Sequence, residues 1–67
     1  MPTELILIGG EHLQVTASFQ EVRDSIASGR AIDTKRFAGF RGEEVVAGED
    51  VLVLTSALAA IVTITAP

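Results

Sequence analysis

Apolar runs separated by glycine predict a β-hairpin at the start of the chain. Residues 5–8 are Leu-Ile-Leu-Ile, Gly9 and Gly10 follow, and residues 13–16 are Leu-Gln-Val-Thr. Adjacent glycines supply the positive φ values that a two-residue hairpin turn requires. Because the first strand is apolar at every position, we expect it either at the centre of a sheet or buried by a partner.

The expected turn also determines which side chains share a face of this hairpin. With the two glycines as the turn, alternation places four apolar side chains on one face: Ile6, Ile8, Leu13 and Val15. The opposite face then carries Leu5 and Leu7 beside His12 and Gln14. We expect a helix to cover the first face, which leaves the second face available as an interface.

The clearest helix is predicted over residues 17–29. Ser18 and Glu21 form a capping box, in which each side chain accepts a hydrogen bond from the other residue's backbone N–H. Three apolar side chains recur at helical spacing and predict one stripe: Phe19, Val22 and Ile26. Gly29 is suited to ending the helix in the left-handed conformation. A helix of about ten residues is too short to be stable alone, so the stripe must pack on the sheet.

The second half of the chain predicts further strands. A second hairpin is expected around Arg41-Gly42-Glu43, and a further turn at residues 48–50. Residues 55–60 favour helix by propensity, but their shortness indicates a single turn before the last strand, at residues 61–65. We therefore expect one α+β domain over residues 1–67, in the order β-β-α-β-β-β. Its architecture is a small, mainly antiparallel sheet or partial barrel with one short helix packed on one face.

The last seventeen residues, 51–67, carry no charge. A membrane-spanning helix needs about 20 apolar residues, whereas this run contains four Ser or Thr residues and follows the acidic pair Glu49-Asp50. Its many β-branched side chains suit a pleated sheet. The run is therefore expected to form two buried strands and no membrane segment.

The ending of the chain resembles that of a known class of small barrels. Residues 53–62 are similar in apolar pattern to the strand, short turn and strand that end Sm-like and SH3-like barrels. The basic and histidine residues that the bacterial Sm-like RNA chaperone carries there are missing, and the predicted helix follows the second strand. No functional residue is carried over from this resemblance.

The size of the chain favours association. A domain of 67 residues removes only about 60% of its unfolded surface from water, and small domains of this kind depend on disulfides, metals or oligomerisation. The chain has no cysteine, and 48% of its residues are hydrophobic. We therefore expect a homo-oligomer, or a small subunit of a larger protein assembly, with the face of Leu5, Leu7, His12 and Gln14 as its interface.

The charge and the cysteine content limit which cellular compartments and which binding partners we expect. The net charge of −4 opposes binding to nucleic-acid phosphates and anionic lipids unless the cations cluster. The absence of cysteine and of a basic signal-peptide region predicts a cytoplasmic location. A cysteine-free chain is also compatible with a virion or another assembly.

Few side chains are suited to catalysis or metal binding. His12 is the single histidine, has no evident nucleophile beside it, and is interpreted as a partly exposed strand residue. The acidic pairs Glu43-Glu44 and Glu49-Asp50 lack the ligand spacing of a calcium loop. We expect no enzyme activity, no catalytic or metal site and no cofactor. Oligomerisation would allow two further kinds of binding site: a metal site built from several copies of His12, and a small-ligand pocket between subunits.

One segment supports an alternative function, a nucleic-acid-binding module. Residues 30–41 hold four of the five cations and two of the three aromatic residues: Arg30, Lys35, Arg36, Phe37, Phe40 and Arg41. Basic and aromatic residues together are typical of platforms that stack single-stranded bases. Phe37 and Phe40 are three apart, so a regular strand points them to opposite faces unless a bulge at Gly39 realigns them. The simpler interpretation, which we favour, is that one Phe packs in the core while the cations neutralise nearby carboxylates.

Overall fold

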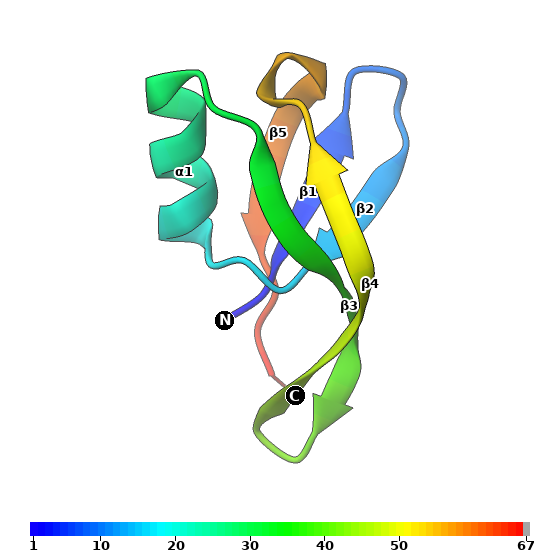
Figure 1. Ribbon diagram of the computed structural model, residues 1–67. Coiled ribbons are helices and arrows are strands. Elements are labelled where there is room, and N and C mark those ends of the chain that lie inside the picture. The colour runs from blue at the N-terminus through cyan, green and yellow to red at the C-terminus, as the bar shows by residue number, and fades with distance from the viewer. Residues whose placement is uncertain (67) are drawn as a thin grey trace.

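A computed structural model describes residues 1–66, which form a single sheet with one α-helix beside it (Figure 1). In chain order the elements are β1 (Thr3–Leu7), β2 (His12–Val15), α1 (Phe19–Ser28), β3 (Ile32–Arg41), β4 (Glu44–Val53), a 3₁₀ turn η1 (Thr55–Ala57) and β5 (Leu58–Thr63). The strands of the described residues are antiparallel neighbours in the order β4-β3-β2-β1-β5. The expected α+β class and element order are confirmed, and β1 is a central strand.

The register of the first hairpin differs from the prediction by one residue. Leu5 pairs with Leu13 and Ile6 with His12, because Leu7 lies opposite Glu11 and a three-residue loop, residues 8–10, replaces the expected two-residue turn. The loop is closed by bonds from the Leu7 N–H to the Glu11 carbonyl at 2.8 Å and from the Gly10 N–H to the Leu7 carbonyl at 2.9 Å. A slip of one residue moves every affected side chain to the other face.

The corrected register places the core on the face that α1 covers. Its buried members come from β1, β2, the connection before α1, α1, β3 and β4: Leu5, Val15, Ala17, Val22, Ile32 and Val53. Leu7 and Leu13 pack against this cluster from the same face of the hairpin. Leu5 is 0% exposed, so the interface role expected for it is wrong: it lies in the interior of the single chain.

Two threonine side chains fix the connection between β2 and α1. The buried Thr3 hydroxyl donates to the Ala17 carbonyl at 2.8 Å. The Ala17 N–H donates to the Thr34 hydroxyl at 3.1 Å, and Thr34 is also within 3.3 Å of the Thr16 hydroxyl. Both polar groups of the buried Ala17 backbone are thereby satisfied, as buried backbone groups must be. The start of the helix is held to β1 and β3 at once.

The helix begins and ends as the sequence predicts. Ser18 and Glu21 form the reciprocal capping box, with distances of 3.1 and 3.2 Å, and Gly29 adopts the left-handed conformation at φ 69°. The predicted apolar stripe is only partly buried, however. Val22 lies in the core, whereas Phe19 and Ile26 are 37% and 42% exposed. A ten-residue helix therefore presents one central side chain to the core and leaves its two flanking apolar residues at the surface.

The second hairpin is longer than predicted. The turn at Gly42-Glu43 is confirmed, since Arg41 pairs with Glu44, and Gly42 has the positive φ of 63° that the first position of a two-residue turn favours. The turn expected at residues 48–50 is wrong, because these residues lie within β4. They form a register irregularity opposite Arg36. In Figure 1 the tip of this hairpin extends beyond the end of β2 as an arm.

The uncharged end of the chain contributes the last residues of β4 at one edge of the sheet and the whole of β5 at the other. The single turn predicted before the last strand is present as η1, and β5 begins earlier than expected, at Leu58. Burial of both strands is not observed, since Leu52, Leu54 and Val62 are all exposed. No helix in residues 1–66 combines the length and hydrophobicity that crossing a membrane requires.

Replacing Ser18 with Ala removes the side-chain acceptor for the Glu21 amide. We expect a loss of about 1 kcal/mol in the free energy of unfolding, measured by urea denaturation followed by circular dichroism. Ser18→Asp is the matched control, because Asp is an equally good capping residue and should retain most of the stability. Equal losses in both variants would show that the cap hydrogen bond contributes nothing.

Replacing Thr3 with Val keeps the shape of the side chain but removes the donor to the Ala17 carbonyl. Because that carbonyl lies in a buried environment, we expect a cost of about 1–3 kcal/mol in the free energy of unfolding. Thr63 pairs with Thr3 across β1 and β5 but is exposed, so Thr63→Val should change stability by less than about 0.5 kcal/mol. A Thr3→Val protein as stable as wild type would contradict the anchoring role.

Candidate functional site

The four residues expected at an interface do not form one surface. Leu5 and Leu7 point to the core face of the sheet, whereas His12 and Gln14 are exposed and lie on the opposite, outer face with their partners Ile6 and Glu4. His12 Nδ1 lies 3.4 Å from Glu4 Oε2. The outer face is therefore more polar at this end than the sequence predicted, with a histidine and a carboxylate side by side.

Apolar side chains are exposed elsewhere on the molecule. Among the described residues, eight large hydrophobic side chains are exposed: Met1, Ile8, Phe19, Ile26, Val45, Leu52, Leu54 and Val62. Seven hydrophobic residues are buried, so the core takes up fewer apolar residues than remain at the surface. Sequence reasoning missed the exposure of Leu52, Leu54 and Val62 because residues 51–54 and 58–62 are apolar runs without alternation, which give no signal of the solvent face.

An apolar hollow runs beside β5. It has a volume of about 260 Å³ and is lined by Ile26 of α1 together with Thr55, Leu58, Ala59, Ala60 and Ile61. On the outer face of the same strand, Val62 is 48% exposed and pairs with Glu4, while Ala60 pairs with Ile6. Hydrophobic surface thus accompanies β5 on both faces of the sheet.

The cations of residues 30–41 are mostly engaged within the chain. Lys35 Nζ lies 3.0 Å from Asp50 Oδ1, and the Arg36 guanidinium pairs with the Glu49 carboxylate. Gly48 makes room for this pair, because a Cβ there would lie 3.1 Å from Arg36 Nη2 and 3.3 Å from the Arg36 carbonyl oxygen. Arg41 is exposed at the tip of the hairpin arm. The expectation that cations neutralise nearby carboxylates is confirmed for Lys35 and Arg36.

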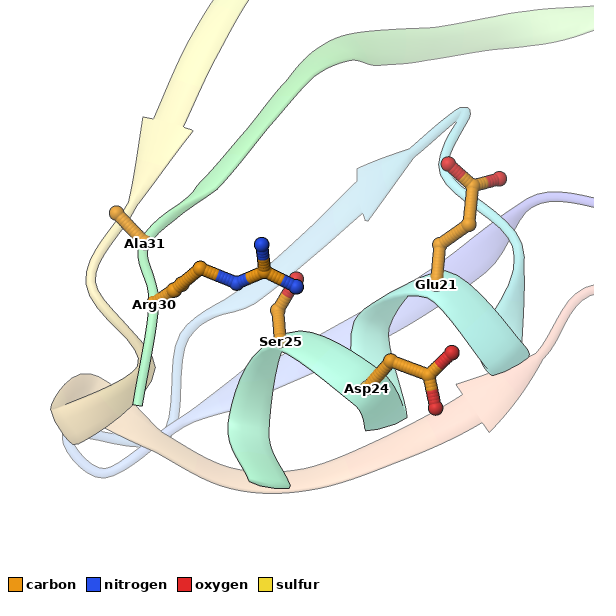
Figure 2. A pocket seen from close by; sticks show the side chains of 5 residues that line it. All are labelled: Glu21, Asp24, Ser25, Arg30 and Ala31. Atoms are coloured by element: carbon orange, nitrogen blue, oxygen red, sulfur yellow. The ribbon is translucent and has the colours of Figure 1, made fainter. Parts of the chain in front are cut away.

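Arg30 lies apart from the other cations, at the end of α1. Figure 2 shows its guanidinium extending over Ser25, in an open hollow of about 370 Å³ that Glu21 and Asp24 also line. The Arg30 Nε–H donates to the Ser28 hydroxyl at 3.0 Å. A basic group that shares the hollow with two carboxylates and a serine gives it mixed charge, so it presents no uniformly positive surface to a phosphate.

The two phenylalanines of the segment contact each other. A register irregularity between Phe37 and Gly39 brings the Phe37 and Phe40 rings to an edge-on arrangement, with centroids 4.9 Å apart and planes at 67°. Phe37 is only 8% exposed and Phe40 is half-buried. The bulge does realign the rings, but it turns them toward each other, and the interpretation that one Phe is buried is confirmed.

The ion pair between Arg36 on β3 and Glu49 on β4 shifts the pKa of one carboxyl group. The hydrogen bond from Arg36 holds the pKa of the Glu49 carboxyl below its ordinary value. A carboxylate whose pKa is lower in the folded chain contributes stability above its unfolded pKa and loses that contribution as the pH falls through the folded pKa. The contribution is small because the pair is open to solvent, where ions and water screen it.

Comparison with known proteins assigns no family to this arrangement. No protein-family model, no curated protein sequence and no solved structure matches the chain. Within residues 1–66, no three His, Cys, Asp or Glu side chains gather in a group that could hold a metal ion. Function must therefore be inferred from the surfaces of the fold.

Replacing Arg36 with Gln should raise the pKa of Glu49 back toward its ordinary value, because the charged donor is lost. The measurement is an NMR titration of the Glu49 side-chain carboxyl carbon between about pH 2 and pH 7, which brackets the ordinary glutamate range. Arg41→Gln is the matched control, since Arg41 pairs in register with Glu44 and should leave the Glu49 midpoint unchanged. An unaltered midpoint in Arg36→Gln would refute this account of the pair.

Proposed function

We propose that this chain is a non-enzymatic assembly protein that acts as a homo-oligomer or as a small subunit of a larger complex. The observation that carries the proposal is the eight large hydrophobic side chains left exposed by the folded single chain, against seven hydrophobic residues buried. Exposed apolar surface that is gathered along one part of a small domain marks a protein interface. Here the hollow beside β5 and the exposed Val62 provide such a gathering.

The polar groups of the chain support a binding role more than a catalytic one. His12 and Glu4 form a pair on an open strand surface, and neither lines the two hollows described above. General acid–base catalysis requires such groups to be positioned around a bound substrate. A cytoplasmic location, which fits a chain without cysteine, is part of the same proposal.

The nucleic-acid alternative has weaker support. Stacking platforms need free aromatic faces and cations that release counterions on binding. In this chain Lys35 and Arg36 are each paired with a carboxylate, and Phe37 is buried beside Phe40. The net charge of −4 adds general repulsion of phosphates.

Sedimentation velocity at low micromolar concentration tests the proposal. We expect a species whose mass is a multiple of the 7.0 kDa chain. Raising the salt from about 0.05 to about 0.5 M should strengthen association, because salt screens the repulsion between acidic chains and leaves apolar contacts intact. A fluorescent single-stranded oligonucleotide serves as the control and should show no change in anisotropy. A well-folded monomer at every concentration and salt would contradict self-assembly.

A further inference from the structure

The two edges of the sheet differ in how they are protected. β4, at one edge, carries Glu44, Glu49 and Asp50 and has a register irregularity opposite Arg36. Charged residues and bulges are the usual devices that prevent an edge strand from pairing with another chain. β5, at the other edge, has the sequence Leu-Ala-Ala-Ile-Val-Thr, with no charged residue and no proline. Beyond the register shift at its start, β5 therefore has none of these devices, and no charge on it opposes pairing with a further strand.

We propose that β5 pairs antiparallel with β5 of a second copy of this chain, about a twofold axis at Val62. The inference rests on the proposed self-assembly and names the surface and the register that carry it. Twofold pairing makes one patch complementary to itself. It joins two five-stranded sheets into one continuous sheet and removes the open edge from both.

The backbone hydrogen bonds indicate which groups are available. The Ile64 N–H donates to the Pro2 carbonyl at 2.9 Å, and β1 and β5 pair without interruption from Ile6–Ala60 to Thr3–Thr63. Because bonded and non-bonded pairs alternate along an antiparallel ladder, the groups of Ala60 and Val62 face β1. Those of Ile61 and Thr63 face outward, where the described chain offers no strand.

This alternation selects the position of the axis. The register of β5 against β1 shifts before Ala60, so the regular part of the strand is residues 60–64, and its midpoint is Val62. With the axis there, Ile61 pairs with Thr63 of the second copy, and Thr63 pairs with Ile61 of that copy. Each such pair exchanges two hydrogen bonds, so every outward backbone group of the regular segment is satisfied.

Side chains and charges fit the same arrangement. A twofold axis perpendicular to the sheet places both copies of Val62 together on the outer face. The apolar hollow of each copy, with Ile26 at its rim, then lies on the helix side of the joined sheet. The nearest carboxylates, the two copies of Glu4, would stand three strand spacings apart, about 14 Å. That distance exceeds the screening length of about 8 Å at physiological salt, so their repulsion is weak.

Single cysteines test this register directly, because the chain has no cysteine of its own. Across the axis the two Val62 Cα atoms form a non-bonded pair about 4.5 Å apart, which a disulfide can bridge. Two copies of Ala60 would be about 13 Å apart, beyond disulfide reach. Both residues are exposed on the same face of β5, so Ala60→Cys is a matched control.

Under mild oxidation, Val62→Cys should form a covalent dimer about tenfold or more faster than Ala60→Cys, because only the former meets disulfide geometry. In urea the two rates should become equal. Equal rates in native buffer, or faster linkage of Ala60→Cys, would overturn the β5 pairing. Sedimentation of the wild-type protein separates the two proposals: an oligomer without Val62→Cys linkage refutes only this register, whereas a monomer refutes self-assembly as well.

Discussion

The pairing register of β1 and β2 is the constraint on which the rest of the structure depends. Because Leu5 pairs with Leu13 and Thr3 with Val15, one face of this hairpin becomes wholly apolar except for Thr3, whose hydroxyl is used to hold the Ala17 carbonyl. The helix then has one face on which to place Val22. After a slip of one residue, Glu4 would share a face with Val15 and Gln14 would share the other with Leu5, so a polar side chain would lie on whichever face the helix covered.

A small core is the consequence of covering one sheet with one short helix. The hairpin of β3 and β4 extends past β2, where its far half is held by pairing between the two strands out to Arg41 and Glu44. The helix buries Val22 but leaves Phe19 and Ile26 at the surface. A chain in which 48% of residues are hydrophobic therefore retains apolar surface after folding, and this exposed surface is the basis of the proposed assembly role.

Charged side chains lie along the β4 edge of the sheet, whereas the β5 edge has none. Lys35 and Arg36 on β3 pair with Asp50 and Glu49 on β4, which neutralises the basic segment and places polar groups along that edge. The last seventeen residues contribute no charge at all. The same arrangement argues against a nucleic-acid role for the cations and leaves the β5 edge without charged side chains.

The sequence by itself determined the features that arise within a few residues: the capping box at Ser18, the left-handed Gly29, the turn at Gly42, the element order and the α+β class. Tertiary structure decided what depends on distant partners. The hairpin register, and with it the positions of Leu5 and His12, follows from burial against Val22 and Val53. Gly48 lies in a strand, where Arg36 occupies the space that a Cβ would need. Val62 is exposed because β5 lies at an edge of the sheet. The same apolar run of β-branched residues could equally form a buried strand, so the sequence does not predict this exposure.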